Sequence, residues 1–142
     1  MAGKRNLGMG LDLLLTAAAT SIESNSEHQA YPQGDGNKVQ SREEAVRNSV
    51  IASMAQAIDE DERGNIFEAY HLYRLVIDQL KQSRLGNQPE LCAIISQALN
   101  NAAVILCEYG KSESAAAYLS QAVKLQPSNQ VAKENLQALE QY

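Results

Sequence analysis

From Ser41 almost to the C-terminus, apolar residues recur at helical spacing, and single residues that end helices interrupt them at intervals. These interruptions are Gly64, Gly86, Gly110 and Pro127. An apolar residue at every third or fourth position gives a helix one apolar face, and glycine ends helices because it adopts left-handed backbone angles readily. No segment alternates apolar and polar residues strictly enough for a strand. The chain is therefore predicted to be all-α.

Five helices are expected in this part of the chain. Their predicted ranges are 41–62, 66–84, 88–109, 112–125 and 128–141. The first begins with the capping-box pattern of Ser41–Glu44. The residues expected to cap or start the later helices are Asn65, Asn87, Ser112 and the pair Pro127 and Ser128.

Composition agrees with a small helical domain. Aromatic residues make up 5% of the 142 residues, with no Trp and one Phe, so the core must consist of small aliphatic side chains packed closely. This favours helices over sheets. The net charge of −5 and the scattering of the 12 basic residues argue against nucleic-acid binding, which needs clustered Lys and Arg. The length excludes a multidomain enzyme.

The first 40 residues differ from the rest, because they contain five of the eight glycines. Residues 31–37 read YPQGDGN and follow a polar run, which is typical of a linker. We therefore expect an N-terminal docking peptide at 1–22, helical when bound, then a disordered linker at 23–40 and a folded domain at 41–142. Lys4 and Arg5 precede an apolar run as in a secretory signal, but Asp12 interrupts that run and disfavours secretion.

The two cysteines, Cys92 and Cys107, fall fifteen positions apart in one predicted helix. Their Cα atoms would be roughly 22 Å apart at the helical rise per residue, so they cannot form a disulfide with each other. Both are expected to be small buried residues of a protein in a reducing compartment. A cytoplasmic location is therefore predicted, and no stretch is expected to span a membrane.

Two helical hairpins carry the same spacing of small and large residues. The matching sets are Gly64, Ala69, Tyr73, Val76 and Gly110, Ala115, Leu119, Ala122. The second hairpin, over residues 99–130 and including its closing Pro127, resembles a tetratricopeptide repeat. The first lacks the closing proline and is offset by 46 residues rather than the usual 34. The resemblance implies two such hairpins and a C-terminal capping helix that contains Val131, Ala132, Leu136 and Leu139.

The resemblance also implies a concave groove that binds protein, lined by the first helix of each hairpin. In the second hairpin this face would present Gln97, Asn100, Val104, Cys107 and Glu108. Asn100 is the best candidate contact, because a side-chain amide can hydrogen-bond the backbone of an extended peptide. The alternative is that Asn100 or Asn101 only solvates the helix. The groove lacks the Lys and Arg set that would bind a C-terminal carboxylate.

Residues 3–15, GKRNLGMGLDLLL, resemble the extreme N-terminus of chromosome-partitioning ParB proteins. The matching residues are Leu7, Gly8, Gly10, Leu11, Asp12 and Leu14, preceded by the basic Lys4 and Arg5. The resemblance implies a linear motif that docks on a ParA or MinD-type ATPase. Met9 replaces the family's arginine, which stimulates ATP hydrolysis, so activation is either lost or supplied by Lys4 and Arg5. The alternative is that this peptide packs back on the domain.

Catalytic and metal-binding patterns are not found. His28 and His71 have no Cys, Ser or Asp at a recognisable spacing. The run Asp59–Glu62 is not a calcium loop, because Arg63 occupies the fifth position and Tyr70 the twelfth. It is interpreted as a solvated helix end, with binding of a basic partner segment as the alternative. Gly8–Gly10 is not a phosphate loop. No enzyme activity, cofactor or metal is therefore expected.

The expected function is that of a bacterial protein-interaction adaptor, whose N-terminal motif docks on a ParA or MinD-type ATPase while the repeat domain binds a partner protein. The alternative is a tetratricopeptide-type chaperone for a secretion-system client. Dimerisation is compatible with both functions.

Overall fold

The computed structural model describes residues 3–5 and 34–141. In this part of the chain the helices are α2 (Gly34–Glu62), α3 (Ile66–Gln82), α4 (Pro89–Glu108), α5 (Ser112–Leu125) and α6 (Gln130–Glu140), with a 3₁₀ turn, η1 (Arg84–Asn87), before α4. The described residues include no strand. The predicted all-α fold class is confirmed.

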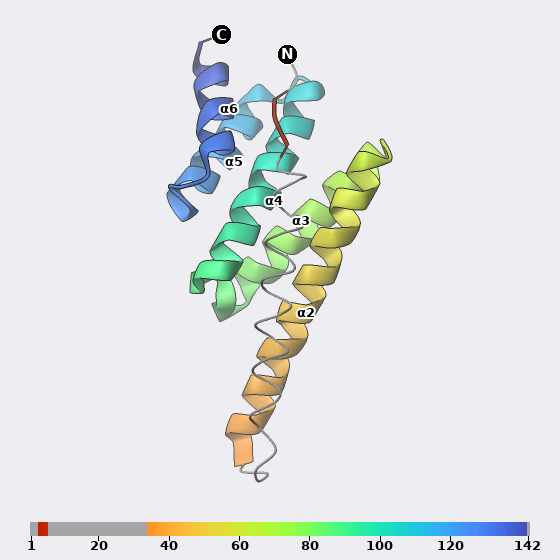
Figure 1. Ribbon diagram of the computed structural model, residues 1–142, viewed down its shortest axis with the longest axis vertical. Coiled ribbons are helices and arrows are strands. Elements are labelled where there is room, and N and C mark those ends of the chain that lie inside the picture. Colours follow the sequence, from red (N-terminus) through yellow and green to blue (C-terminus); the bar gives the residue numbers. More distant parts are fainter. Residues whose placement is uncertain (1–2, 6–33, 142) are drawn as a thin grey trace.

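Each helix packs against the next one along the chain, and consecutive helices alternate in direction (Figure 1). Helix α4 lies at the centre, because it contacts α3, α5 and α6. Its length and apolar composition would allow it to span a membrane, which sequence analysis did not expect. However, 72% of its apolar window is buried inside the fold, so α4 serves here as the core helix.

The residues that repeat between the two hairpins have the same role in both. Ala69, Tyr73 and Val76 are buried in α3, and their counterparts in α5, Ala115, Leu119 and Ala122, are buried as well. The two glycines that precede these helices have positive φ angles, 83° at Gly64 and 73° at Gly110. Such angles are strained for residues with a Cβ, so glycine allows each tight reversal between helices.

The start of α2 corrects the predicted boundary between linker and domain. The helix begins at Gly34, so residues 34–40 are helical and Ser41 lies inside the helix rather than at its cap. The Ser41 hydroxyl donates to the carbonyl oxygen of Lys38 one turn earlier, as serines within helices often do. Lys38 and Gln40 are exposed, and residues 34–40 do not show the apolar spacing by which a helix is identified in a sequence.

The helix caps also differ from the prediction. Asn65 precedes α3, but its side chain makes no capping bond and its amide donates to Glu60 instead. Gln88 is the cap of α4 because Pro89 takes the first helical position, where its fixed φ fits. Lys111 precedes α5. At α6 the cap is Asn129, whose side chain accepts a hydrogen bond from the Ala132 N–H at 3.1 Å.

Candidate functional site

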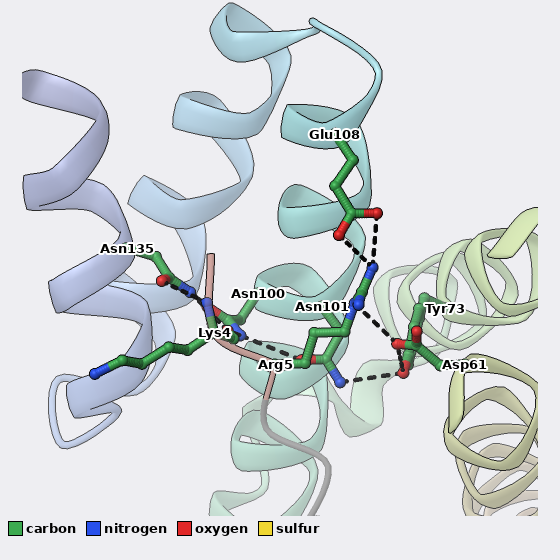
Figure 2. Close-up of polar contacts among 8 residues, drawn as sticks. All are labelled: Lys4, Arg5, Asp61, Tyr73, Asn100, Asn101, Glu108 and Asn135. Carbon is green, nitrogen blue, oxygen red and sulfur yellow. Dashed lines mark hydrogen bonds and ion pairs between the residues drawn. The ribbon is translucent and has the colours of Figure 1, made fainter. Parts of the chain in front are cut away.

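A short non-helical segment, Gly3–Arg5, lies across the face of α4 between the end of α2 and α6 (Figures 1 and 2). The residues that face it come from four helices. They are Asp61 from α2, Tyr73 from α3, Asn100, Asn101 and Glu108 from α4, and Asn135 from α6. We call this surface the groove. It brings the N-terminus of the chain against residues that are as many as 131 positions away.

Two buried asparagines bind the backbone of Lys4. The Lys4 N–H donates to Asn135 Oδ1 at 2.9 Å, and Asn135 Nδ2 donates to the Lys4 carbonyl oxygen at 2.7 Å. Asn100 Nδ2 donates to the same carbonyl at 2.9 Å. Asn135 Nδ2 also donates to Asn100 Oδ1 at 2.8 Å, which fixes the two side chains relative to each other. We call this pair the amide clamp, and it binds the backbone of a residue rather than its side chain.

The side chain of Arg5 enters an acidic pocket formed by Asp61, Tyr73 and Glu108. Arg5 Nη2 donates to both Glu108 carboxylate oxygens at 3.0 Å, and Arg5 Nε lies 3.2 Å from Asp61 Oδ2. The Asp61 side chain is 1% exposed and that of Arg5 is 19% exposed, so this ion pair is largely removed from water. The contacts with Glu108 are charge-assisted hydrogen bonds, which are stronger than neutral ones, whereas the contact with Asp61 is an ion pair.

A chain of hydrogen bonds connects the acidic pocket with the amide clamp (Figure 2). The Tyr73 hydroxyl donates to Asp61 Oδ2 at 2.9 Å, and Asn101 Nδ2 donates to the Tyr73 oxygen at 3.2 Å. Asn100 Nδ2 donates to Asn101 Oδ1 at 3.2 Å, which completes the connection. The network orders the groove, because each polar side chain in it limits the orientation of the next.

Burial sets the protonation behaviour of the acidic pocket. It raises the pKa of Asp61 above the ordinary value of 3.8, while the hydrogen bond from Tyr73 and the charge of Arg5 act in the opposite direction. Burial and the neighbouring Asp61 charge raise the pKa of Tyr73 strongly, so its hydroxyl keeps its proton and remains a donor. The pocket is thus a buried carboxylate that favours a cationic partner.

The two other residues of the segment meet different surroundings. A Cβ placed on Gly3 would lie 3.0 Å from Val104 Cγ2 and 3.1 Å from Asn135 Oδ1, so only glycine fits without displacing its neighbours. The Lys4 side chain points outward and is 72% exposed, and its ammonium lies 3.0 Å from Glu134. Exposed ion pairs of this kind contribute little to binding.

An apolar cavity of about 450 Å³ continues the groove beside Gly3. Its lining includes Val104, Cys107, Leu119 and Leu139, from α4, α5 and α6.

Both cysteines, Cys107 and Cys92, are free thiols and are partly rather than fully buried. Burial raises the pKa of the Cys107 thiol, which makes it a poor nucleophile.

The structure brings together several residues that the sequence suggested separately. Asn100, Val104 and Glu108 surround the Gly3–Arg5 segment, and Gln97 is buried in α4, three positions before Asn100. Lys4 and Arg5, which belong to the predicted docking motif, contact the groove of their own chain. The remaining residues of the predicted docking motif, Leu7, Gly8, Met9, Gly10, Leu11, Asp12 and Leu14, lie outside the described residues.

Sequence reasoning missed Asp61 and Asn135. The acidic run 59–62 was interpreted as a solvated helix end, but Asp61 is buried and pairs with Arg5. The helical spacing of the sequence indicated that both residues lie on apolar faces. Asp61 continues the apolar face of Met54, Ala57 and Ile58, and Asn135 falls between Ala132 and Leu139 at helical spacing. A polar residue on an apolar face needs a buried partner, and here the partner is the Gly3–Arg5 segment.

The groove has the chemistry of a binding site. Among the described residues, no group of three His, Cys, Asp or Glu side chains is arranged to hold a metal ion. The polar side chains of the groove are amides, carboxylates and a phenol. They bind the backbone of Lys4 and the guanidinium of Arg5. No protein-family model, curated protein or solved structure matches the chain.

Proposed function

We propose that this chain is a non-enzymatic protein-interaction adaptor of the bacterial cytoplasm, with a groove that binds an extended peptide and an N-terminal motif that docks on a ParA or MinD-type ATPase. The observation that carries the proposal is the amide clamp. Asn100 and Asn135 together satisfy the backbone N–H and the backbone carbonyl of one residue, Lys4, as a receptor for an extended chain must.

The proposed tetratricopeptide architecture is supported by the packing of the helices. Successive antiparallel helices with small buried residues at Ala69 and Ala115 suit stacked hairpins, and α6 covers the last of them. Asn100 is buried on the first helix of the second hairpin, the position at which a groove contact was expected.

The ATPase part of the proposal rests on the sequence of residues 4–15. While Arg5 pairs with Asp61 and Glu108, its guanidinium is not available to a second protein. Docking on an ATPase through the leucines and Asp12 is compatible with this arrangement, whereas use of Arg5 to stimulate hydrolysis requires that the segment first leave the groove.

A secretion chaperone is the second candidate function. It is favoured by one feature of the amide clamp, which contacts only backbone atoms of Lys4 that any extended client segment also offers. In that function the groove alone would hold the client, and no ATPase would be required.

The test is a pull-down from a bacterial lysate with full-length chains, with and without ATP, and identification of bound proteins by mass spectrometry. The chains compared are the wild type, Leu11→Ala/Asp12→Ala and Asn100→Ala. Both variants retain Gly3–Arg5, which deletion of residues 1–20 would remove. The adaptor predicts an ATP-dependent ATPase that the Leu11→Ala/Asp12→Ala chain loses. A chaperone predicts partners that this chain keeps and that Asn100→Ala loses.

A further inference from the structure

We propose that the groove is a receptor for a partner peptide with the pattern glycine, any residue, arginine, and that the chain's own Gly3–Arg5 segment is an internal ligand that competes for it. This inference rests on the proposed peptide-binding function and specifies the chemistry of the partner.

The first position selects glycine by size. A Cβ at this position would lie 3.0 Å from Val104 Cγ2 and 3.1 Å from Asn135 Oδ1, closer than such atoms normally approach. Asn135 cannot move away freely, because its amide also bonds the Lys4 backbone and Asn100. A larger residue would therefore push Asn135 away from its hydrogen bonds with the Lys4 backbone and weaken the clamp.

The groove contacts the second position through its backbone. All three hydrogen bonds between Lys4 and the amide clamp involve its N–H or its carbonyl oxygen. The side chain is 72% exposed, and its partner Glu134 is 43% exposed. The groove is therefore expected to accept many residue types at this position, with a small preference for a basic residue.

The third position selects arginine. Two carboxylates from different helices, Asp61 and Glu108, approach different nitrogens of one guanidinium. Lysine has a single ammonium and cannot satisfy both groups in this fork-like geometry. The Asp61 carboxylate is buried, so an occupant without a positive charge would leave it unpaired at a large cost.

The internal ligand is suited to being displaced. Three residues make the described contacts, and they are tethered to α2 through residues 6–33. A tethered ligand acts at an effective concentration on the order of millimolar, so a partner peptide with more contacts can replace it. Displacement would free Lys4 and Arg5, the two basic residues of the predicted docking motif.

The experiment measures binding of a fluorescein-labelled peptide with the sequence of residues 2–8, AGKRNLG, to full-length chains by fluorescence anisotropy. The Arg5→Ala chain should bind the probe about tenfold more tightly than the wild type, because its internal ligand is weakened. Lys4→Ala is the matched control chain and should differ from the wild type by less than about threefold. Circular dichroism establishes that each chain is folded.

Probe variants then test each position on the Arg5→Ala chain. Replacing the probe's arginine by alanine should weaken binding at least about tenfold, whereas replacing its lysine by alanine should change it less than about threefold. Replacing the probe's first glycine, which corresponds to Gly3, by valine should abolish binding. Adding Asn135→Ala to the Arg5→Ala chain should weaken binding of the unmodified probe.

Two results would overturn the inference and leave peptide binding intact. One is equal affinity of the wild type and the Arg5→Ala chain, which would exclude the internal competitor. The other is equal affinity of the alanine and arginine probes, which would exclude the selectivity. Failure of every probe to bind a folded Arg5→Ala chain overturns the inference as well, and the lysate experiment then decides independently whether the adaptor function also fails.

Discussion

At the scale of single residues, Asp61 is the most unusual side chain in the described part of the molecule. It is a carboxylate with a 1% exposed side chain in a small domain, and its cationic partner, Arg5, comes from a separate segment. The Asp61 carboxylate also accepts a hydrogen bond from the Tyr73 hydroxyl. Buried charges without a partner are costly, so the ionised form of Asp61 depends on the Arg5 charge.

We predict that Asp61→Asn makes the fold more stable at pH 7 and weakens the binding of Arg5 in the groove. Because burial raises the folded-state pKa of Asp61, the stability that this group contributes is greatest below 3.8 and is lost as the pH rises through the raised pKa. Asparagine can still accept the Tyr73 hydrogen bond, and it carries no charge. The thermal midpoint of the variant should therefore exceed that of the wild type at pH 7, and the difference should disappear in acid. A lower midpoint at pH 7 would contradict this account.

Removing Arg5 should raise the pKa of Asp61 further. The Arg5 charge lowers that pKa. Arg5→Ala therefore removes one of the two main influences that oppose the rise in pKa caused by burial. Carbon-13 NMR of the Asp61 side-chain carboxyl, titrated against pH, measures the change. The matched control is Lys4→Ala, whose exposed side chain pairs with Glu134 and should leave the Asp61 titration where it is. Equal titration of Asp61 in the wild type and Arg5→Ala would mean that Arg5 does not occupy the acidic pocket in solution.

At the scale of elements, the turn before α5 depends on Gly110. Its φ is 73°, and an added Cβ would meet no atom within 4 Å, so the cost of Gly110→Ala comes from the backbone alone. We predict a loss of about 1–2 kcal/mol in the free energy of unfolding, measured by chemical denaturation. Gly64→Ala, in the equivalent turn with a φ of 83°, should cost a similar amount. A much larger loss at one of them would show that the two turns are not equivalent.

The elements themselves could mostly be predicted from the sequence. Each of α3 to α6 has an apolar face with buried residues and a nearby glycine or proline that interrupts the pattern, so local periodicity sufficed. The start of α2 was misplaced because residues 34–40 do not show the apolar spacing of a helix in the sequence. A solvated helix has no apolar face, and a glycine-containing stretch then looks like a linker.

The site could be predicted only in part. Asn100 and Glu108 were identified because both lie on one helix whose groove face the repeat resemblance implied. Asp61 and Asn135 belong to other helices, and the sequence does not say which helices meet around the same point. Contacts across as many as 131 residues depend on packing, which periodicity does not specify.

At the scale of the whole molecule, the Gly3–Arg5 segment connects helices that do not all contact one another directly. Arg5 binds Asp61 of α2 and Glu108 of α4, while the Lys4 backbone binds Asn135 of α6. Helix α6 is the last in the array, and its buried residues are Ala132 and Asn135. The occupied groove should therefore stabilise the docking of α6 more than it stabilises α4, which neighbouring helices cover on several sides.

Hydrogen exchange measured by mass spectrometry tests this coupling. We predict that Arg5→Ala accelerates exchange in α6 about fivefold, as expected for a loss of roughly 1 kcal/mol in local stability. Exchange at the centre of α4 should remain much slower than exchange in α6, because its amides open only with the global unfolding of the core. Lys4→Ala keeps the Arg5 contacts and should leave α6 protected. If Arg5→Ala and Lys4→Ala have the same slow exchange in α6, the segment occupies the groove without stabilising it, and displacement by a partner peptide would then leave the docking of the last helix unchanged.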